Sequence, residues 1–334
     1  MHMDHMSGAR VFVTGADGFI GSHVVEQCVR AGASVRALSC YSSFDADGWL
    51  DDLAPEVRGS VEVLRGDVRD GALMRRACEG RDIVLHLAAL IGIPYSYESP
   101  SSYVDVNVHG TLNVLMGARD AGVARVVHTS TSEVYGTAQT CPIREDHPLV
   151  GQSPYAASKI AADKLAEACF LSFGVPVVTL RPFNTFGPRQ SQRAVIPTVV
   201  RQALDPAARV IEVGDVSTER DWLFVRDTAA AFIACAGPGA VLGQTYNAGT
   251  GAKISVAEMI RCVLRASGVD KPVESRQDRM RPAKSEVRVL QADHAALTAA
   301  TGWAPSYEFV RGIEETVAWW RTRDIAALSK GYRV

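Results

Sequence analysis

The sequence lacks any long uncharged hydrophobic run. No stretch approaches the roughly 18 apolar residues of a membrane-spanning helix, and the best candidate, residues 83–93, is short and contains His86. There is also no excess of one charge, because 35 Lys and Arg face 37 Asp and Glu and the formal net charge is −2. We therefore expect a soluble protein that binds neither membrane nor nucleic acid and meets anionic ligands with local charges.

Cysteine is sparse and scattered. The seven cysteines stand at positions 28, 40, 78, 141, 169, 235 and 262, without a C-x-x-C pair. This pattern favours neither a disulfide framework nor a cysteine-based metal site, and it predicts reduced, small core residues in a cytoplasmic protein. Residues 1–7 lack the long apolar stretch of a secretion signal, and we interpret them as a cloning remnant or a frayed terminus.

From Arg10 onward, short apolar runs alternate with longer amphipathic segments. This alternation predicts βαβ units, and hence an α/β fold with a Rossmann-type doubly wound parallel sheet. The expected strands are residues 11–14, 34–38, 61–65, 83–87, 125–129 and 175–181, and the expected helices are residues 21–31, 70–78, 104–121 and 154–172.

The composition changes after about Pro182, where proline and glycine become closely spaced and apolar runs become short. The length of 334 residues allows one large domain or two. We expect a dinucleotide-binding domain over residues 8–182 and a smaller, partly interleaved α/β substrate lobe over residues 183–330.

The first expected strand runs directly into a glycine-rich turn. Gly15, Gly18 and Gly21 stand where a chain must turn tightly, approach a pyrophosphate and begin a helix whose N–H groups bind phosphate. Three such glycines also occur in ordinary strand-to-helix turns. Their place in the first βαβ unit favours dinucleotide binding.

The second expected strand ends without the acid that usually binds the adenosine ribose, because that position holds Ser39. A site without this carboxylate does not repel a 2′-phosphate, so the sequence leaves NAD and NADP open. The candidate phosphate contacts are Arg36, Ser39, Ser42 and Ser43. Asp67, after the third strand, lies either at the adenine edge or at the N-cap of the next helix.

Tyr155 and Lys159 stand four residues apart in an expected helix, so both emerge on one face. An ammonium beside a phenol lowers the tyrosine pKa from about 10 toward neutrality, which suits proton removal from an alcohol. The spacing alone is common on solvated helix faces. The string at residues 128–136 adds hydroxyls and one acid, Glu133, at the sheet edge where ligands bind.

In this combination and order, the motifs resemble those of the extended short-chain dehydrogenases/reductases, in the NAD(P)-dependent epimerase/dehydratase family that acts on nucleotide sugars. The resemblance covers nearly the whole chain. The residues that carry it are Gly15, Gly18, Gly21, Asp67, residues 86–89, residues 107–111, Thr131, Tyr155, Lys159 and residues 181–188.

The resemblance implies a role for each motif. Tyr155 would be the base, Thr131 would hydrogen-bond the reacting hydroxyl, and Lys159 would tune Tyr155 and bind the nicotinamide ribose. The implied contacts to a tightly bound NAD or NADP, regenerated at each turnover, are Gly15, Asp17, Gly18, Phe19, Ile20, Gly21, Ser39, Asp67, Val68, Leu87, Ala88, Ala89, Asn107, Tyr155 and Lys159. Residues 104–121 and 154–172 would pair in a homodimer.

Glu133 narrows the reaction that the resemblance implies. In 4,6-dehydratases this glutamate removes the C5 proton after oxidation at C4, and the product is a 4-keto-6-deoxy sugar nucleotide. Many of them carry Asp before it, whereas this chain has Ser132, as in the GDP-mannose type. Glu133 would then act as both base and acid, with Ser132 as a relay.

Three other functions stay open. The Ser-Glu-Val-Tyr-Gly string also occurs in UDP-glucuronate decarboxylases, which lose CO₂ after the same oxidation. A nucleotide-sugar 4-epimerase is the next alternative, and a cofactor-binding regulatory protein is the alternative without catalysis.

The expected substrate is a UDP- or GDP-linked hexose. Residues 90–97 and 187–198 resemble those of dehydratases that act on N-acetylhexosamine nucleotides in nonulosonic-acid pathways, which indicates N-acetylglucosamine. The implied substrate contacts are Glu133, Asn184, Arg193, Arg220 and Arg281. Arginine suits a diphosphate because its planar fork binds phosphate oxygens in pairs. Apart from the resemblance, Arg279 and Arg281 are equally compatible with a solvated basic loop. Arg189 and Arg193 are both expected to line the nucleotide or sugar pocket, and the sequence does not distinguish their roles.

Overall fold

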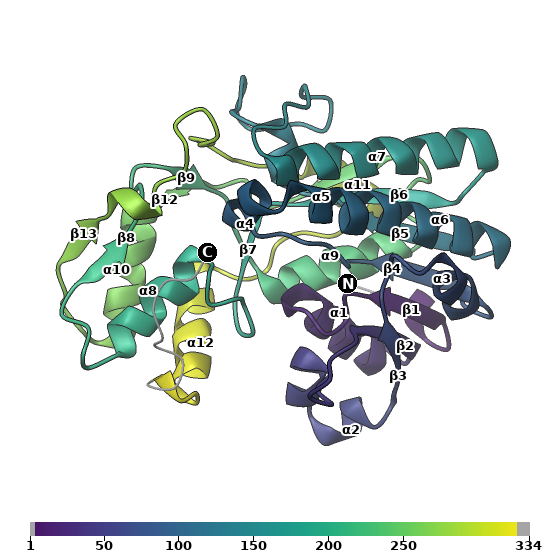
Figure 1. Ribbon diagram of the computed structural model, residues 1–334, viewed down its shortest axis with the longest axis horizontal. Coiled ribbons are helices and arrows are strands. Elements are labelled where there is room, and N and C mark those ends of the chain that lie inside the picture. Colours follow the sequence, from purple (N-terminus) through teal and green to yellow (C-terminus); the bar gives the residue numbers. More distant parts are fainter. Residues whose placement is uncertain (1–3, 326–334) are drawn as a thin grey trace.

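A computed structural model describes residues 4–325, and its central feature is a seven-stranded parallel sheet (Figure 1). The strand order is β11-β6-β5-β4-β1-β2-β3, the order of a doubly wound Rossmann fold with one added strand. The bounds are β1 (Arg10–Thr14), β2 (Ser34–Cys40), β3 (Val61–Gly66), β4 (Ile83–His86), β5 (Arg125–Thr129), β6 (Val177–Pro182) and β11 (Thr245–Ala248).

Helices cover both faces of this sheet. On one face α3 (Gly71–Cys78), α6 (Gly110–Asp120) and α7 (Pro154–Phe173) pack side by side, and on the other α1 (Phe19–Arg30) packs against α9 (Val225–Ala236). Each face closes a separate apolar core, with Val24 and Phe232 in one and Met74 and Leu115 in the other. The expected α/β class, the six expected strands and the four expected helices are confirmed.

A smaller lobe follows β6. Its core lies among α8 (Val195–Leu204), α10 (Val256–Ser267) and α12 (Phe309–Arg321). Three short strand pairs complete it: β7 (Asn184–Phe186) with β10 (Trp222–Phe224), β8 (Ile211–Val213) with β13 (Val273–Ser275), and β9 (Glu219–Arg220) with β12 (Ile254–Ser255). The remaining helices are α2 (Pro55–Arg58), α4 (Ile93–Glu98), α5 (Pro100–Tyr103) and α11 (Ala295–Thr301).

The chain returns from the smaller lobe to the large sheet in two elements that the sequence did not predict. β11 pairs with β6, and α9 packs on α1, so the expected interleaving is confirmed. β11 carries Asn247 among its four residues, and α9 is apolar on nearly all sides, so neither shows a clear period. The boundary at residue 182 stays a prediction.

Two smaller expectations were wrong. Met6 is fully buried and His5 Nε2 lies 3.0 Å from the carbonyl oxygen of Ile233, so residues 4–7 belong to the fold, whereas residues 1–3 lie outside the described part. Five cysteines are buried as expected, but Cys40 and Cys141 are exposed. Between residues 4 and 325, no helix is long and apolar enough to cross a membrane.

A buried polar network lies beneath the carboxyl ends of β5 and β6. The Asp163 carboxylate on α7 accepts hydrogen bonds from His128 Nε2 at 3.1 Å, Ser130 Oγ at 2.7 Å and Arg181 Nη2 at 3.1 Å. Burial favours the protonated acid, but the hydrogen bond from His128 and the charge of Arg181 hold the pKa of Asp163 below its usual value. The network therefore fixes α7 against two neighbouring strands.

Arg181 carries this network on to the edge of the sheet. Its Nη1 donates to Tyr135 Oη at 2.9 Å, and Tyr135 Oη donates to Asn247 Oδ1 at 2.7 Å. Asn247 lies on β11 and is fully buried. The turn after β5 is thus tied to the last strand that joins the sheet.

We expect Asp163→Asn to lower the free energy of unfolding by about 3–5 kcal/mol, because the change leaves the buried guanidinium of Arg181 without its counter-charge. Urea denaturation near neutral pH measures the loss. Because the pKa of Asp163 is lower in the folded state, the wild-type advantage should shrink as the pH falls below about 4.

Glu167→Gln is the matched control on the same helix. Its ion pair with Lys164, at 2.7 Å, is exposed, and we expect a loss of at most about 1 kcal/mol. Equal losses for the two variants would contradict the role given to Asp163.

Candidate active site

The glycine-rich turn between β1 and α1 packs directly on the loop after β4. Gly15 has a φ of 65°, and a Cβ there would lie 2.7 Å from the backbone nitrogen of Ala88, whereas a Cβ at Gly21 would lie 2.0 Å from the carbonyl oxygen of Gly15. No side chain fits at either position. α1 then begins after Gly18 without a side-chain cap, which leaves its first N–H groups available to a phosphate, so the turn fits a dinucleotide.

Buried polar side chains hold the loop after β4 in place. The Thr14 hydroxyl accepts hydrogen bonds from the backbone nitrogens of Leu87 and Ala88, both at 3.1 Å. Asn107, which is fully buried, accepts from the Leu90 nitrogen at 2.8 Å and donates to Ser158 Oγ at 2.9 Å. Asn107 therefore ties this loop to α7, and its predicted contact with the cofactor stays a prediction.

The five residues predicted to carry the chemistry, Ser132 among them, converge at the carboxyl end of β5. Thr131 caps the 3₁₀ helix Ser132–Tyr135, because its Oγ1 accepts from the Glu133 nitrogen at 3.3 Å. Tyr155 and Lys159 lie on the first turns of α7 and are 8% and 3% exposed. A hydrogen bond with Thr131 and the charge of Glu133 both act on the Tyr155 phenol, so these three groups are neighbours.

The sequence predicted that Lys159 lowers the pKa of Tyr155, and this prediction was wrong. Burial raises the pKa of the phenol, and the hydrogen bond with Thr131 offsets only part of that rise. Burial also lowers the pKa of Lys159 to about 8, although the charge of Asp163 opposes the shift. The expectation failed because it counted the ammonium and left out the removal of water from both groups.

A cluster of two arginines and two glutamates faces this group. Arg281 Nη1 lies 3.7 Å from Glu133 Oε1 and 3.9 Å from Glu286 Oε1, and Arg220 Nη2 lies 3.1 Å from Glu286 Oε1. Arg220 is 5% exposed. The structure thus places the predicted substrate residues Arg220 and Arg281 near Glu133, the residue predicted to take the C5 proton.

Glu286 was not among the site residues predicted from the sequence. The signal was available, because two arginines assigned to a buried pocket need acidic partners and Glu286 stands five residues after Arg281.

The other predicted substrate residues are less closely gathered. Asn184, at the start of β7, has a buried side-chain oxygen without a protein partner, as expected of a ligand contact. Arg193 is exposed, and its charge acts on Tyr103, whose ring lies 6.3 Å from that of Tyr155. Arg189 instead lies 3.3 Å from Glu26, so the structure separates the two arginines.

Arg279 and Asp67 have protein partners of their own. Arg279 Nη2 lies 2.7 Å from Glu212 Oε2, so this guanidinium is held in the smaller lobe. Asp67 accepts from Arg69 Nη2 at 2.7 Å, and Asp70 caps α3, so the alternative that Asp67 caps this helix was wrong.

The Val68 side chain is buried against Gly110, and the Val68 carbonyl oxygen accepts a hydrogen bond from Asn113 Nδ2 at 3.0 Å. The contacts predicted for Asp67 and Val68 stay predictions.

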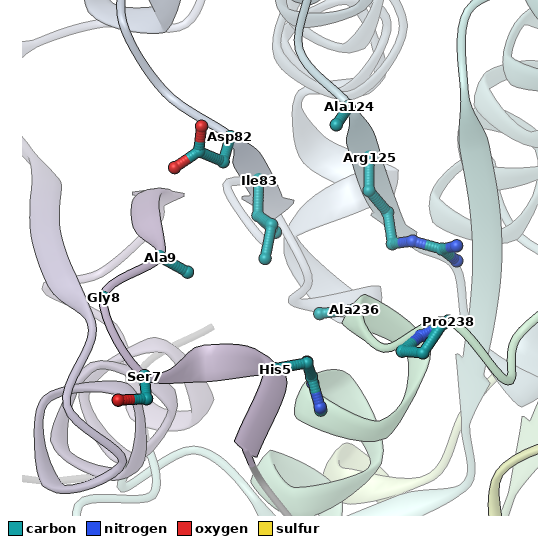
Figure 2. A pocket seen from close by; sticks show the side chains of 10 residues that line it. All are labelled: His5, Ser7, Gly8, Ala9, Asp82, Ile83, Ala124, Arg125, Ala236 and Pro238. Atoms are coloured by element: carbon teal, nitrogen blue, oxygen red, sulfur yellow. The ribbon is translucent and has the colours of Figure 1, made fainter.

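A separate pocket lies at the opposite edge of the sheet, at the amino ends of the strands (Figure 2). Its lining residues are His5, Ser7, Gly8, Ala9, Asp82, Ile83, Ala124, Arg125, Ala236 and Pro238. Asp82 is bound by Arg10 at 2.6 Å, and Arg125 Nη1 donates to the Ala240 oxygen at 2.8 Å, so both charges have protein partners. This pocket is remote from the predicted chemistry.

Comparisons with known proteins agree with this geometry. The family model described as GDP-mannose 4,6 dehydratase matches residues 12–316. A dTDP-glucose 4,6-dehydratase from Streptomyces griseus is 37% identical over 314 residues, which cover 93% of each chain. A UDP-glucose 4-epimerase from Mycolicibacterium smegmatis is 33% identical over 318 residues, which cover 94% of this chain and 99% of that one.

Among solved structures, the dTDP-glucose 4,6-dehydratase of Streptomyces venezuelae with NAD bound has a TM-score of 0.83 at 32% identity, covering 94% of this chain and 97% of that one. Family, relatives and fold therefore agree over almost the whole length. The chain belongs to the GDP-mannose 4,6-dehydratase-type family of extended short-chain dehydrogenases/reductases, the NAD-dependent epimerases and dehydratases of nucleotide sugars.

Proposed function

We propose that this protein is an NAD(P)-dependent nucleotide-sugar 4,6-dehydratase that acts on a hexose nucleotide. The observation that carries the proposal is the position of Glu133, which lies beside Thr131 and Tyr155 at the end of β5. Oxidation at C4 alone needs only a base for the hydroxyl. A carboxylate next to that base supplies the second proton transfer that loss of water requires.

The glycine-rich turn and the loop after β4 would hold the cofactor, with Lys159 at its nicotinamide ribose. When bound, a nicotinamide cofactor would take hydride from C4 and return it at C6. Tyr155 would remove the proton of the C4 hydroxyl, which requires that positive charge brought by the bound cofactor and that of Lys159 offset the effect of burial on its pKa, while Thr131 would orient that hydroxyl by a hydrogen bond.

Glu133 then acts on the 4-keto sugar. It takes the proton from C5, which the new carbonyl makes acidic, and the C6 hydroxyl leaves with a proton as water. Ser132 is 3% exposed beside Glu133 and is suited to relay that proton. C5 is finally reprotonated, and the proton released from the C4 hydroxyl balances the one that C5 receives. The net change is the loss of one water.

Arg281 supports the alternative of a UDP-glucuronate decarboxylase. Its guanidinium lies 3.7 Å from Glu133, so a carboxylate at C6 would meet a cation there. The sugar, the nucleotide base, the homodimer and the cytoplasmic location expected from the sequence stay predictions.

Mass spectrometry of a substrate panel separates these functions. Purified protein is incubated with dTDP-, UDP- and GDP-linked hexoses, UDP-N-acetylglucosamine and UDP-glucuronate, without cofactor and then with NAD or NADP. Loss of one water from a hexose nucleotide supports the dehydratase. Loss of CO₂ from the glucuronate alone would favour the decarboxylase, and an isomer of unchanged mass, separated by chromatography, would favour the epimerase.

We expect Glu133→Gln to reduce water loss by at least about 100-fold, because the amide cannot accept the C5 proton. Oxidation at C4 should persist, so reduced cofactor should accumulate with the substrate that the panel identifies. Absorbance of the reduced cofactor and the mass of the sugar nucleotide measure the two steps separately. Glu98→Gln, an exposed change on α4, is the control. Undiminished water loss in Glu133→Gln would refute its role.

Lys159 sets a pH dependence. Because burial lowers its pKa from 10.5 to about 8, we expect kcat/KM to fall as the pH rises above about 8 and the ammonium is lost. The folded pKa lies below the unfolded one, so stability should rise by up to about 1.4 kcal/mol per pH unit between these values. Activity and stability should therefore change in opposite directions.

A pH–rate profile and thermal unfolding over the same range test this expectation. Lys159→Arg keeps its charge and should move the alkaline loss of activity to higher pH. A wild-type profile that stays flat from pH 7 to about 10 would contradict it.

A further inference from the structure

Although β2 ends without an acid, a carboxylate from the glycine-rich turn reaches the end of this strand. Asp17 Oδ2 accepts a hydrogen bond from the backbone nitrogen of Cys40 at 2.9 Å. Cys40 is the residue after Ser39, which holds the position where the ribose-binding acid of a Rossmann fold usually stands. The Asp17 carboxylate is therefore fixed next to the missing group.

A second carboxylate lies beside it, on the segment that follows β2. The Trp49 nitrogen donates to the Asp17 carbonyl oxygen at 2.9 Å, and a Cβ at Gly48 would lie 2.6 Å from that oxygen. The segment is thus pressed onto the glycine-rich turn, and it brings Asp47 near Ser39, whose buried hydroxyl has no hydrogen-bond partner among the described residues. Burial raises the pKa of Asp17, and the nearby charge of Asp47 raises it further, so the two carboxylates are neighbours.

The arginines of this region are already engaged. Asp47 accepts from Arg65 Nε and from Arg58 Nη2, both at 2.8 Å. Arg36, a candidate phosphate contact from the sequence, donates to Glu62 at 3.0 Å and to the Ala77 oxygen at 2.8 Å, toward β3 and the end of α3. Arg36 is therefore not the phosphate contact that the sequence allowed.

We propose that Asp17 replaces the missing acid, accepts a hydrogen bond from the adenosine ribose of the cofactor, and together with Asp47 makes this chain select NAD over NADP. A 2′-phosphate would bring up to about two negative charges beside the Asp17 carboxylate, and the arginines next to Asp47 are engaged by that carboxylate and so offer the phosphate little compensation. The 2′-hydroxyl of NAD is neutral and donates to Asp17. The inference rests on the cofactor binding in the proposed function, and not on which sugar reacts.

Calorimetric titration of the cofactor-free protein with NAD⁺ and NADP⁺ tests the selectivity directly. We expect NAD⁺ to bind on the order of 100-fold more tightly. Any nucleotide released from the freshly purified protein on denaturation should have the mass of NAD. In Asp17→Asn, which keeps an acceptor for Cys40, NAD⁺ should bind about 10-fold more weakly and the preference should fall to about 10-fold or less.

Asp45→Asn is the matched control, because it makes the same substitution on the neighbouring segment that carries Asp47. The Asp45 side chain is 85% exposed and pairs with Arg65 at 2.5 Å, and we expect the preference for NAD⁺ to be unchanged. If thermal unfolding shows that Asp17→Asn does not fold, Asp17→Ser, which also offers an acceptor to Cys40, takes its place.

Equal affinities of the wild type for the two cofactors, or an unchanged ratio in the Asp17 variants, would overturn the inference. The proposed reaction can fail separately. A protein that prefers NAD⁺ but converts no sugar nucleotide would refute only the dehydratase, and one that dehydrates with a preference for NADP⁺ would refute only the role of Asp17.

Discussion

The buried contact between Asp163 and Arg181 determines where the reacting groups lie. Asp163 stands one helical turn beyond Lys159 on α7, and its partners belong to the adjacent strands β5 and β6. With the helix fixed at this point, Tyr155 and Lys159 are held against the turn that carries Thr131 and Glu133. A charge pair inside the protein costs desolvation and returns little net stability, so its main effect here is on position.

Local sequence patterns determined which parts of the fold were predictable. The six strands were predictable because each is a short apolar run, as expected of a parallel sheet covered on both faces, and the four helices because each places apolar residues at helical spacing. β11 and α9 were not predicted. The polar Asn247 interrupts the short apolar run of β11, and α9 is buried on nearly all sides, so neither shows a clear period. The spacing of the glycines predicted the first turn correctly, because backbone atoms of the turn itself and of Ala88 leave no room for a Cβ at Gly15 or Gly21.

The site was predictable in its residues and less so in its electrostatics. Thr131, Glu133, Tyr155 and Lys159 were found because each stands in a local motif. Their pKa values depend on burial by segments distant in sequence, which no spacing reveals. The partners of Arg189, Arg279 and Arg281 are likewise distant or lie in irregular loops. Sequence patterns thus locate charged groups but do not pair them.

The return of the chain to the large sheet has a consequence for synthesis. β11 is the last strand of the large sheet along the chain, and it follows only the first part of the smaller lobe, since α10 and α12 come after it. During translation, β6 therefore remains an unpaired edge strand of the sheet until residue 248 has been synthesised. By then α9 has already been made. Only then can Asn247 accept the hydrogen bond of Tyr135, so the active-site turn is fixed after all six other strands of the sheet have been made and before the core of the smaller lobe is completed.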